Sequence, residues 1–493
     1  MNKHIPQEVV TVLHSLMKAS FDAYAVGGCV RDLLIKKEPK DWDLTTNATP
    51  TEVQTLFPDS FYENDFGTVG VKVTPFLSIG KVDREHDVVE VTTYRIESTY
   101  SDRRRPDDVQ FAKTLEEDLS RRDFTMNAIA LAVQNLTSKE ASIQLIDPFD
   151  GQKDIEAKVI RAVGDAHERF NEDALRMIRA VRLGAELDFT IEEKTLEAIK
   201  KNAALLTHVS IERIRDEFSR IIMSQHPKHG IELLHDTDLL RYIVPELEDG
   251  IGVEQNHHHT YTVWEHNLRA LETCPSKKLS VRLATLLHDV GKPRAKRGKG
   301  RECTFYNHEY VGEHMTRKIL TRLRYPKKVI DHASLLVRNH MFYYSVDEVS
   351  ETAVRRIIRK VGLDNMKDLM DVRIGDRLGS DTKKAKPYKL RHFEYMVEKV
   401  SKDPLSVKML KLNGDIMIKD LNFTPGPKIG AILNVLLAEV IDDPIKNTLE
   451  NLTKRALELK DEELTTLNEL AKERISEKRK EEDQNTKEKH WVK

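Results

Sequence analysis

Two aspartates separated by one residue form the clearest chemical pattern in the chain. Asp41 and Asp43 lie in the segment DWDL, which we predict to be a short strand. Because alternate side chains of a strand point to the same face, both carboxylates would lie on one face and Trp42 on the other. Neighbouring carboxylates repel each other unless cations lie between them, and two metal ions about 4 Å apart are the usual arrangement for in-line phosphoryl transfer. We therefore expect Asp41 and Asp43 to hold Mg²⁺ for such a reaction.

A pair of glycines precedes these aspartates. Gly27 and Gly28 end the predicted strand AYAVGG, where the missing side chains would let the backbone approach a triphosphate. The amides that follow, near a predicted helix start, can donate hydrogen bonds to its oxygens. A third carboxylate on a neighbouring strand would complete the metal site, and Glu90 in VVEVTTYR is our choice. An Asp-x-Asp pair alone is more often a solvated strand end, but the order of GG, VRD and DWDLTT favours catalysis.

A second pair of charged residues suggests base recognition without a template. Asp173 and Arg176 are spaced i and i+3 in a predicted helix, so they would share one face. Asp173 can accept from the exocyclic amino group of cytosine or adenine, and Arg176 can donate to the adjacent ring nitrogen. Guanine and uracil present the reverse pattern and would leave a charged group mispaired. From spacing alone, a simple surface salt bridge is the alternative.

Histidines and aspartates in the middle of the chain indicate a metal site. WEHNL, LLHDVGKP, NHEYVGEH, RNH and IGDRLG follow one another at intervals that suit a helical bundle. Imidazole and carboxylate ligands together suit a divalent transition metal, whose identity the sequence leaves open. Such an ion would activate water for phosphoester hydrolysis. The expected ligands are His266, His288, Asp289 and Asp376 for one ion, and His308 and His340 for a second. The triplet at residues 257–259 is expected to be mostly polar loop.

The string of GG, VRD and DWDLTT resembles the signature of the class II tRNA nucleotidyltransferases. This family contains the CCA-adding enzymes and their bacterial poly(A) polymerase relatives, which share a polymerase-β-like head. RRDFTMNA at 121–128 resembles the ribose-sensing segment, and NEDALRMIRAVR at 171–182 resembles the nucleotide-selecting helix. VSIERIRDE at 209–217 resembles a segment that supports the turn after that helix. The H…HD…H…H…D order resembles the HD phosphohydrolase superfamily, whose domain occurs within many bacterial members of the family.

The resemblance implies template-independent addition of CCA to the 3′ end of tRNA, from CTP and ATP and with release of pyrophosphate. It implies that Asp123 senses a ribose hydroxyl and that the loop YSDRRRPDDVQF, with Asp102, Arg104 and Arg105, helps the pocket to accept ATP. For the HD domain it suggests phosphatase or 2′,3′-cyclic phosphodiesterase activity on damaged tRNA ends. The other nucleotide-binding residues that it implies are Gly27, Gly28, Arg31, Arg121, Arg179 and Arg182.

Three alternatives remain open at this point. A poly(A) polymerase would add long A tails, although GTVGVKV lacks the basic and aromatic residues associated with that branch. An enzyme that adds only A would need a separate CC-adding partner. A protein of another class would act mainly as an HD metal hydrolase with a degenerate transferase head, which the intact carboxylates disfavour.

Composition limits where and with what the protein works. Formal net charge is −2, so any RNA contact must use local basic patches. No run of apolar residues is long enough for a spanning helix, and we expect no membrane partner. The N-terminus has no secretory pattern, and only three cysteines occur, far apart, so we expect a reducing cytoplasm. The oligomeric state is not indicated.

These motifs must be positioned by several domains, since 493 residues predict about three. Strand signals vanish after about residue 150, so we predict an α+β protein: a small mixed-sheet, polymerase-β-like head followed by all-α domains. We place the head at 1–150, a helical neck at 151–240, an HD domain at 241–380 and a helical tRNA-binding tail at 381–475. The charged segment 476–493 has almost nothing to bury, so we expect it to be disordered.

Overall fold

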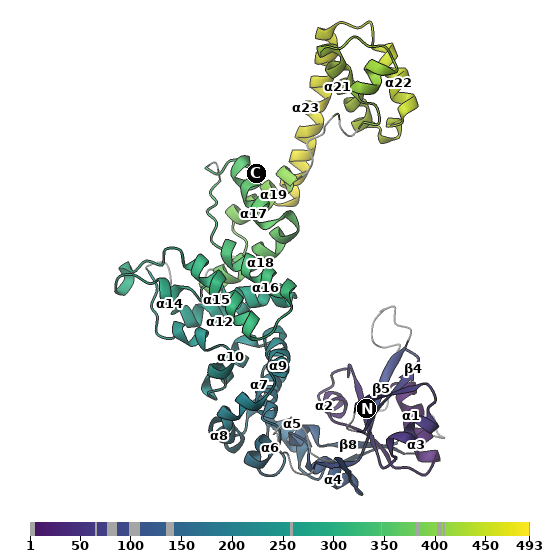
Figure 1. The fold of residues 1–493 in the computed structure, drawn as a ribbon, viewed down its shortest axis with the longest axis vertical. Coiled ribbons are helices and arrows are strands. Elements are labelled where there is room, and N and C mark those ends of the chain that lie inside the picture. The colour runs from purple at the N-terminus through teal and green to yellow at the C-terminus, as the bar shows by residue number, and fades with distance from the viewer. Residues whose placement is uncertain are drawn as a thin grey trace. The chain divides into compact units, whose positions relative to one another are not determined.

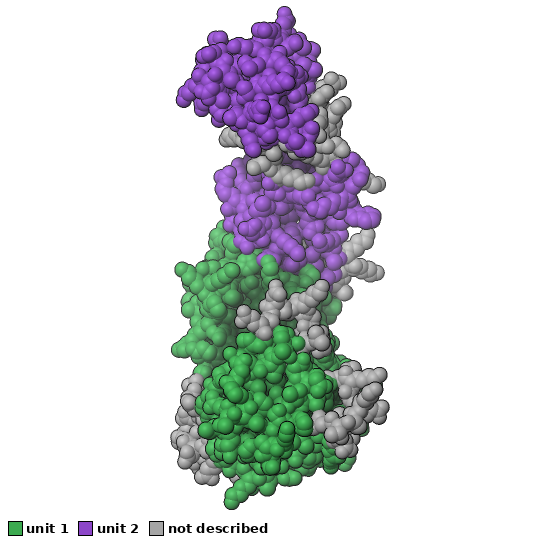
Figure 2. Space-filling model, turned by 90° about the vertical axis from the view of Figure 1, so that its right-hand side faces the viewer, with its two compact units in different colours: residues 1–338, 379–381 green, residues 339–378, 382–493 purple. Residues whose placement is uncertain are grey.

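Two compact units make up the chain in the computed structural model (Figure 2). The first contains residues 1–338 and 379–381, and the second contains 339–378 and 382–493. The structure describes residues 5–64, 67–75, 86–97, 109–134, 142–256, 260–346, 348–380, 385–401, 407 and 410–492. Within these ranges no helix is both long enough and apolar enough to cross a membrane.

A seven-stranded mixed sheet forms the N-terminal part of the first unit (Figure 1). The strand order is β3-β4-β5-β2-β1-β8-β9. β2 and β5 pair in parallel, and the other neighbours pair antiparallel. β2 therefore lies inside the sheet with a partner on each side. The strands are β1 (Ala23–Val26), β2 (Trp42–Thr46), β3 (Ser60–Asn64), β4 (Thr68–Val73), β5 (Asp87–Thr93), β8 (Ala130–Gln134) and β9 (Ser142–Ile146).

Short helices cover this sheet because their apolar residues recur at helical spacing. In α1 (Gln7–Lys18) the residues Val9, Val12, Leu13 and Leu16 are buried, and the helix contacts β1 and β2. α2 (Gly28–Leu34) follows β1, and α3 (Pro50–Leu56) begins at a capping box. α4 (Leu115–Ser120) also begins at a capping box and contacts β6 (Arg95–Glu97), which pairs with β7 (Val109–Phe111).

Helices build the rest of the first unit. α7 (Leu175–Leu187) packs on α9 (Ile211–Met223) and α10 (Pro227–Asp236), and α13 (Leu279–Leu287) packs on α9 and α12 (Val263–Glu272). One short parallel pair, β10 (Val159–Ile160) with β11 (Thr190–Ile191), interrupts the helical region, which we had expected to lack strands. The other helices are α5 (Gly151–Ala157), α6 (Ala166–Glu172), α8 (Glu193–Asn202), α11 (Leu240–Ile243), α14 (Lys292–Ala295), α15 (His308–Arg322) and α16 (Lys327–Asn339).

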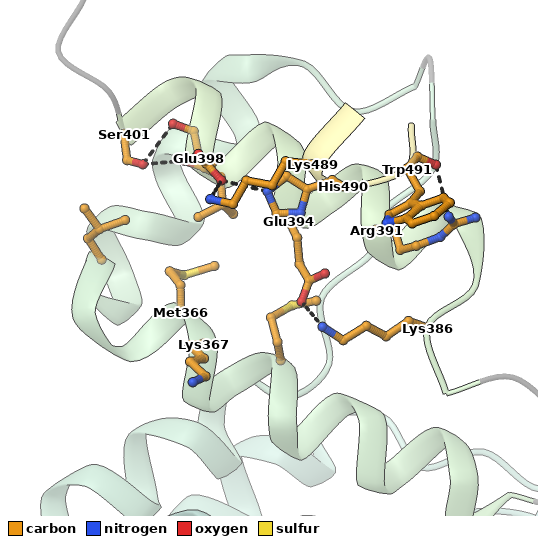
Figure 3. Close-up of a pocket in the computed structure, with 13 residues that line it drawn as sticks. Met366, Lys367, Lys386, Arg391, Glu394, Glu398, Ser401, Lys489, His490 and Trp491 are labelled. Carbon is orange, nitrogen blue, oxygen red and sulfur yellow. Dashed lines mark hydrogen bonds and ion pairs between the residues drawn. The ribbon is translucent and has the colours of Figure 1, made fainter. Parts of the chain in front are cut away.

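The second unit is helical in its described residues. Its largest apolar cluster surrounds α21 (Pro427–Asp442), whose Ile432 and Leu436 are fully buried. A separate pocket of about 500 Å³ has Met366 and Met370 among its lining residues (Figure 3). The remaining helices are α17 (Glu351–Val361), α18 (Met366–Gly379), α19 (Tyr388–Ser401), α20 (Gly414–Lys419), α22 (Leu449–Glu458) and α23 (Leu464–Lys489).

The predicted fold class is confirmed: a mixed-sheet head is followed by helical domains. The expected disorder of 476–493 differs from the structure, in which α23 continues to Lys489. Tertiary contacts explain this, because Asp483 pairs with Lys399 of α19 at 3.3 Å, and Glu398 accepts from Lys489 and His490 at 2.8 and 2.7 Å (Figure 3). A charged segment can thus be helical when another helix supplies its partners.

One predicted helix is also wrong. The sequence pattern of LEEDLSRRDFTMNAIAL predicts one continuous helix, but α4 ends at Ser120, a 3-10 turn occupies Thr125–Asn127, and β8 begins at Ala130. The Asp123 carboxylate accepts from the Phe124 amide at 2.9 Å. Local bonds of this kind compete with helical hydrogen bonds, so the chain turns here.

Candidate active site and metal centre

Parallel pairing of β2 and β5 brings the first predicted carboxylates together. Asp43 lies directly opposite Glu90 in this register, so their side chains share one face of the sheet. Trp42 points to the other face, where it is 1% exposed, as the alternation predicts. Asp41 lies one residue before β2 and is exposed, and Asp43 is half-buried. The residues Asp43 and Glu90 therefore lie beside one another, and Asp41 lies just before the start of β2.

Gly27 stands where the backbone comes close to these groups. Its φ of +82° lies in the left-handed region, and it immediately precedes α2. A Cβ at this position would lie 3.1 Å from Nη1 of Arg122 and 3.5 Å from Oδ2 of Asp43. Only glycine leaves this space open between a carboxylate and a guanidinium group.

A cavity of about 720 Å³ opens at this point, a volume within the usual range for small-molecule sites. Arg122, Asn127 and Arg220 line it; the resemblance had implied a phosphate contact for Arg122, whereas Asn127 and Arg220 were not predicted. Glu90, Arg121, Asp173 and Arg176 are not among its lining residues. The predicted residues that line it are Gly27, Gly28, Arg31, Asp41, Asp43, Asp123, Arg179 and Arg182.

Asp123 is buried at the wall of this cavity and is held by polar neighbours. Its Oδ1 accepts from Nδ2 of Asn127 at 3.1 Å, and its Oδ2 lies 2.8 Å from Nη2 of Arg179. Asn127 also accepts from Nη1 of Arg31 at 2.9 Å. Burial alone would raise the pKa of Asp123, but the Arg179 charge and the Asn127 bond outweigh it and lower the pKa. The carboxylate is therefore ionised at neutral pH.

Arg182 is held by two carboxylates. Its Nε lies 2.7 Å from Glu217, and its Nη1 lies 3.2 Å from Glu186. Burial lowers the pKa of this guanidinium group, and the two carboxylates oppose that effect.

Asp118 was missed by sequence reasoning although it is fully buried. Its Oδ1 lies 2.6 Å from Nη2 of Arg121, and its Oδ2 lies 3.3 Å from Nη2 of Arg122. Thr45 of β2 donates to Oδ2 at 3.2 Å. The i,i+3 and i,i+4 spacing of Asp118 to the two arginines was a signal for this cluster.

Asp173 and Arg176 are not on one continuous helix, so that prediction is wrong in its geometry. α6 ends at Glu172, Asp173 is extended, and α7 begins at Leu175. The Asp173 carboxylate caps α7 by accepting from the Leu175 amide at 3.0 Å. Its other oxygen lies 2.6 Å from Nη2 of Arg213, a residue that was not singled out within its segment.

Arg176 is anchored separately from Asp173. Its guanidinium group pairs with Glu172 and donates to the Arg121 carbonyl at 3.0 Å. The side chain is 8% exposed. Both residues of the predicted base-reading pair are thus fixed by other partners.

A second cluster joins three helices of the first unit. His266 comes from α12, His288 caps the end of α13 and Asp289 follows it. His266 Nε2 lies 3.0 Å from His288 Nε2, and each of these atoms lies 3.3 Å from Oδ2 of Asp289. His308, the first residue of α15, reaches Oδ1 of the same carboxylate at 3.3 Å. The donor atoms of His266, His288 and Asp289 are close enough to hold one metal ion.

Backbone carbonyls orient the imidazoles of this cluster. His288 Nδ1 lies 2.7 Å from the Thr285 carbonyl, and His308 Nδ1 lies 2.8 Å from the Phe305 carbonyl. A carbonyl only accepts, so Nδ1 of each ring carries a proton, which leaves Nε2 as the atom that would bind an ion beside the carboxylate. This is the usual arrangement around a ligated metal. Lys292, which was not predicted, lies 2.6 Å from Oδ2 of Asp289.

The remaining predicted residues stay predictions. His340 and Asp376 are buried in the second unit, where Asp376 pairs with Arg373. Asp102, Arg104 and Arg105 of the expected loop lie outside the described residues, as does the histidine triplet at 257–259.

Three family models match the chain. They are the poly A polymerase head domain at 23–161, the probable RNA- and SrmB-binding site of polymerase A at 188–251, and the HD domain at 256–381. The CCA-adding enzyme of Lactiplantibacillus plantarum is 34% identical over 445 residues, which cover 90% of this chain and 93% of that protein. The CCA-adding enzyme of Lactococcus lactis subsp. lactis is 44% identical over half of this chain and 58% of that protein.

Solved structures show the same relationship. The CCA-adding enzyme of Bacillus stearothermophilus in complex with CTP is 27% identical, with a TM-score of 0.57 over 92% of this chain and 96% of that chain. The Thermotoga maritima CCA-adding enzyme complexed with tRNA shares the fold at 20% identity, with a TM-score of 0.50 over 91% and 94% of the two chains.

Proposed function

The chain belongs to the family of CCA-adding enzymes, and we propose that it adds C, C and A in turn to the 3′ end of tRNA from CTP and ATP. The observation that carries this proposal is the register of Asp43 with Glu90 beside a cavity lined by Asp41, Arg31 and Arg122. Carboxylates and guanidinium groups that line one cavity suit a metal-bound triphosphate.

Asp41 and Asp43 are the residues that we propose to hold Mg²⁺, with Glu90 assisting. Both domain families are metal-dependent, and oxygen ligands are those that Mg²⁺ prefers. Magnesium bound there would lower the pKa of the primer hydroxyl and neutralise the leaving group. In the reaction, the primer 3′ oxygen bonds to the α-phosphorus, the bond from that phosphorus to the bridging oxygen breaks, and pyrophosphate leaves.

The rest of the cavity would hold the nucleotide. We propose that Arg122 and the amides after Gly27 contact the triphosphate and that Asp123 accepts from a ribose hydroxyl, because Gly27, Arg122 and Asp123 line the same cavity. We propose that Asp173 and Arg176 read the Watson–Crick edge of the base, held by Arg213 and by the Arg121 carbonyl respectively. A base with the reverse donor and acceptor pattern would leave these charges mispaired, at about 1–3 kcal/mol for each unsatisfied group.

A second activity is favoured by the His266–His288–Asp289 cluster. We propose that it holds a divalent transition metal and hydrolyses phosphoesters at tRNA ends, and that His308, which reaches the same carboxylate, belongs to a second ion site. Three oriented imidazole and carboxylate groups fit such an ion better than Mg²⁺, which prefers oxygen ligands alone. All three cysteines are buried, which fits a reducing cytoplasm, where we place both activities.

Incorporation into tRNA transcripts that end before CCA tests the transferase proposal. Wild-type protein with Mg²⁺ should incorporate labelled CTP, and Asp43→Asn should reduce the rate by at least about a thousandfold, as expected when an essential metal ligand is lost. Asp216→Asn is the matched control, because Asp216 pairs with the neighbouring Arg215, its side chain is 65% exposed and it does not line the cavity. Equal rates for wild type and Asp43→Asn would overturn the assignment.

A further inference from the structure

The turn of residues 120–122, which we call the arginine turn, carries Arg122, which lines the nucleotide cavity, and bonds to Arg176, which lies outside the cavity lining. On its side-chain side, Arg121 and Arg122 both bond to the buried carboxylate of Asp118. On its backbone side, the Ser120 carbonyl accepts from Arg169 at 3.3 Å, and the Arg121 carbonyl accepts from Arg176 at 3.0 Å. The arginine turn thus carries Arg122 and contacts Arg176, the residue that we propose to read the base.

Asp118 is the group that fixes this turn. It has no solvent exposure, and two guanidinium groups, the Thr45 hydroxyl and the Arg95 amide surround it. Burial would raise the pKa of this carboxyl, but Arg121 and Arg122 lower it, so it is ionised. A buried carboxylate is retained only when it is paired, and removing one partner leaves the other charges uncompensated.

The charge balance of the cluster favours a phosphate contact. Two guanidinium groups against one carboxylate leave one positive charge. Arg122 is the member that lines the cavity, where its Nη1 lies 3.1 Å from the place of a Cβ on Gly27. The bond to Thr45 also ties the cluster to β2, the strand that carries Asp43. The free donors of Arg122 are therefore aimed at the metal-side end of the cavity.

We propose that Asp118 is a positioning residue that sets the phosphate contact of Arg122 and, through the arginine turn, the orientation of Arg176. This inference rests on the proposed nucleotide transfer. Asp118 itself touches neither phosphate nor base. Its loss should therefore weaken triphosphate binding and relax base discrimination together, while a purely structural carboxylate would change stability alone.

Asp118→Asn is the main test, because it keeps the side-chain size and removes the charge. Dissociation constants for CTP and for cytidine separate the phosphate contact from binding of the ribose and base. We expect the CTP constant to rise about ten- to a hundredfold, as for one lost charge-assisted hydrogen bond, and the cytidine constant to rise less, because cytidine has no phosphate for Arg122 to contact. Relative incorporation of GTP and UTP should rise in the same variant.

Glu246→Gln is the matched control. Glu246 binds Arg322 through both oxygens at 2.6 and 2.7 Å in the same unit, and neither residue lines the cavity. This variant should lose stability without a change in CTP binding. In an Arg122→Ala background, Asp118→Asn should cause a much smaller further loss of CTP affinity, because its effect on the phosphate contact passes through Arg122, while the rise in GTP and UTP incorporation should remain. If Asp118→Asn does not fold, Thr45→Val removes one bond to the carboxylate and should shift CTP binding in the same direction.

An unchanged CTP constant in Asp118→Asn, or full additivity with Arg122→Ala, would overturn the inference. A wild-type protein that binds CTP but adds no nucleotide to tRNA would instead overturn the proposed function. The comparison of CTP with cytidine still judges Asp118 in that case, so the two failures are distinguishable.

Discussion

Loss of histidine ligands should abolish a metal-dependent gain in stability of the first unit. His266 and His288 place their Nε2 atoms 3.0 Å apart, and both face the Asp289 carboxylate. A metal that binds the folded state alone stabilises it by about 2.7 kcal/mol when its free concentration is a hundred times its dissociation constant. For a unit of about 340 residues, whose unfolding entropy is about 0.7 kcal/mol/K, that corresponds to a rise of about 4 °C in the melting temperature.

The assay is thermal unfolding of protein first stripped with a chelator and then titrated with Mn²⁺ or Co²⁺. Mg²⁺ is kept constant, so that the carboxylate site in the head does not respond to the titration. Wild-type protein should show the rise, and His266→Ala and His288→Ala should each lose most of it. His235→Ala is the matched control, because His235 pairs with Glu248 away from the cluster. A variant that combines His266→Ala and His288→Ala tests the reasoning further. The reasoning would be refuted if this double variant bound as much metal as the wild type by equilibrium dialysis.

Three further predictions concern fidelity, pH and stability. Arg213→Ala frees Asp173 from its 2.6 Å ion pair, so misincorporation of GTP and UTP should rise about 5- to 150-fold in single-nucleotide assays, and unchanged fidelity would contradict this. Because the pKa of Asp123 is lowered in the fold, despite burial, by Arg179, its contribution to stability is present above about pH 3.9 and is lost as pH falls through the folded pKa. Urea unfolding of Asp123→Asn should therefore depend less steeply on pH below about 4 than wild type, and parallel curves would argue against it. Thr262→Ala removes the capping box of the helix that carries the first metal ligand and should cost about 0.5–2 kcal/mol in urea unfolding, whereas an unchanged midpoint would show that the cap contributes nothing.

Strand alternation predicted the part of the head that holds the carboxylates. AYAV, DWDL and VVEVTT became β1, β2 and β5, because each has buried residues on the face that its pattern assigned. Glu90 was chosen because it is the acidic residue of a neighbouring predicted strand. The parallel register of β2 and β5 puts it opposite Asp43. Local periodicity is sufficient where one face of a strand is buried.

Long-range partners were beyond the sequence. The break between α6 and α7 at Asp173 depends on Arg213, which lies 40 residues further along the chain. The turn after α4 depends on the buried carboxylate of Asp118, whose partners include Thr45 of β2. Spacing rules describe neighbours on one helix, so they predicted a shared face for Asp173 and Arg176 where the chain bends instead.

The metal cluster was predictable as a set of residue types but not as a geometry. The order of histidines and aspartates indicated ligands, and His266, His288 and Asp289 do meet. The participation of Lys292 was not indicated, because its reach to Asp289 arises from the turn between α13 and α14. The backbone carbonyls of Thr285 and Phe305 orient the imidazole rings of the cluster. No sequence pattern indicates such contacts, because every residue has a backbone carbonyl.

The most direct test of the central claim is the 3′-end sequence of a tRNA transcript lacking CCA after incubation with the protein, Mg²⁺ and all four nucleoside triphosphates. The account predicts that the reads end in C, C and A and then stop, with two C residues added when only CTP is supplied and none added when only GTP or UTP is supplied. Long tails of A, or addition of A alone and only to transcripts that already end in CC, would contradict it.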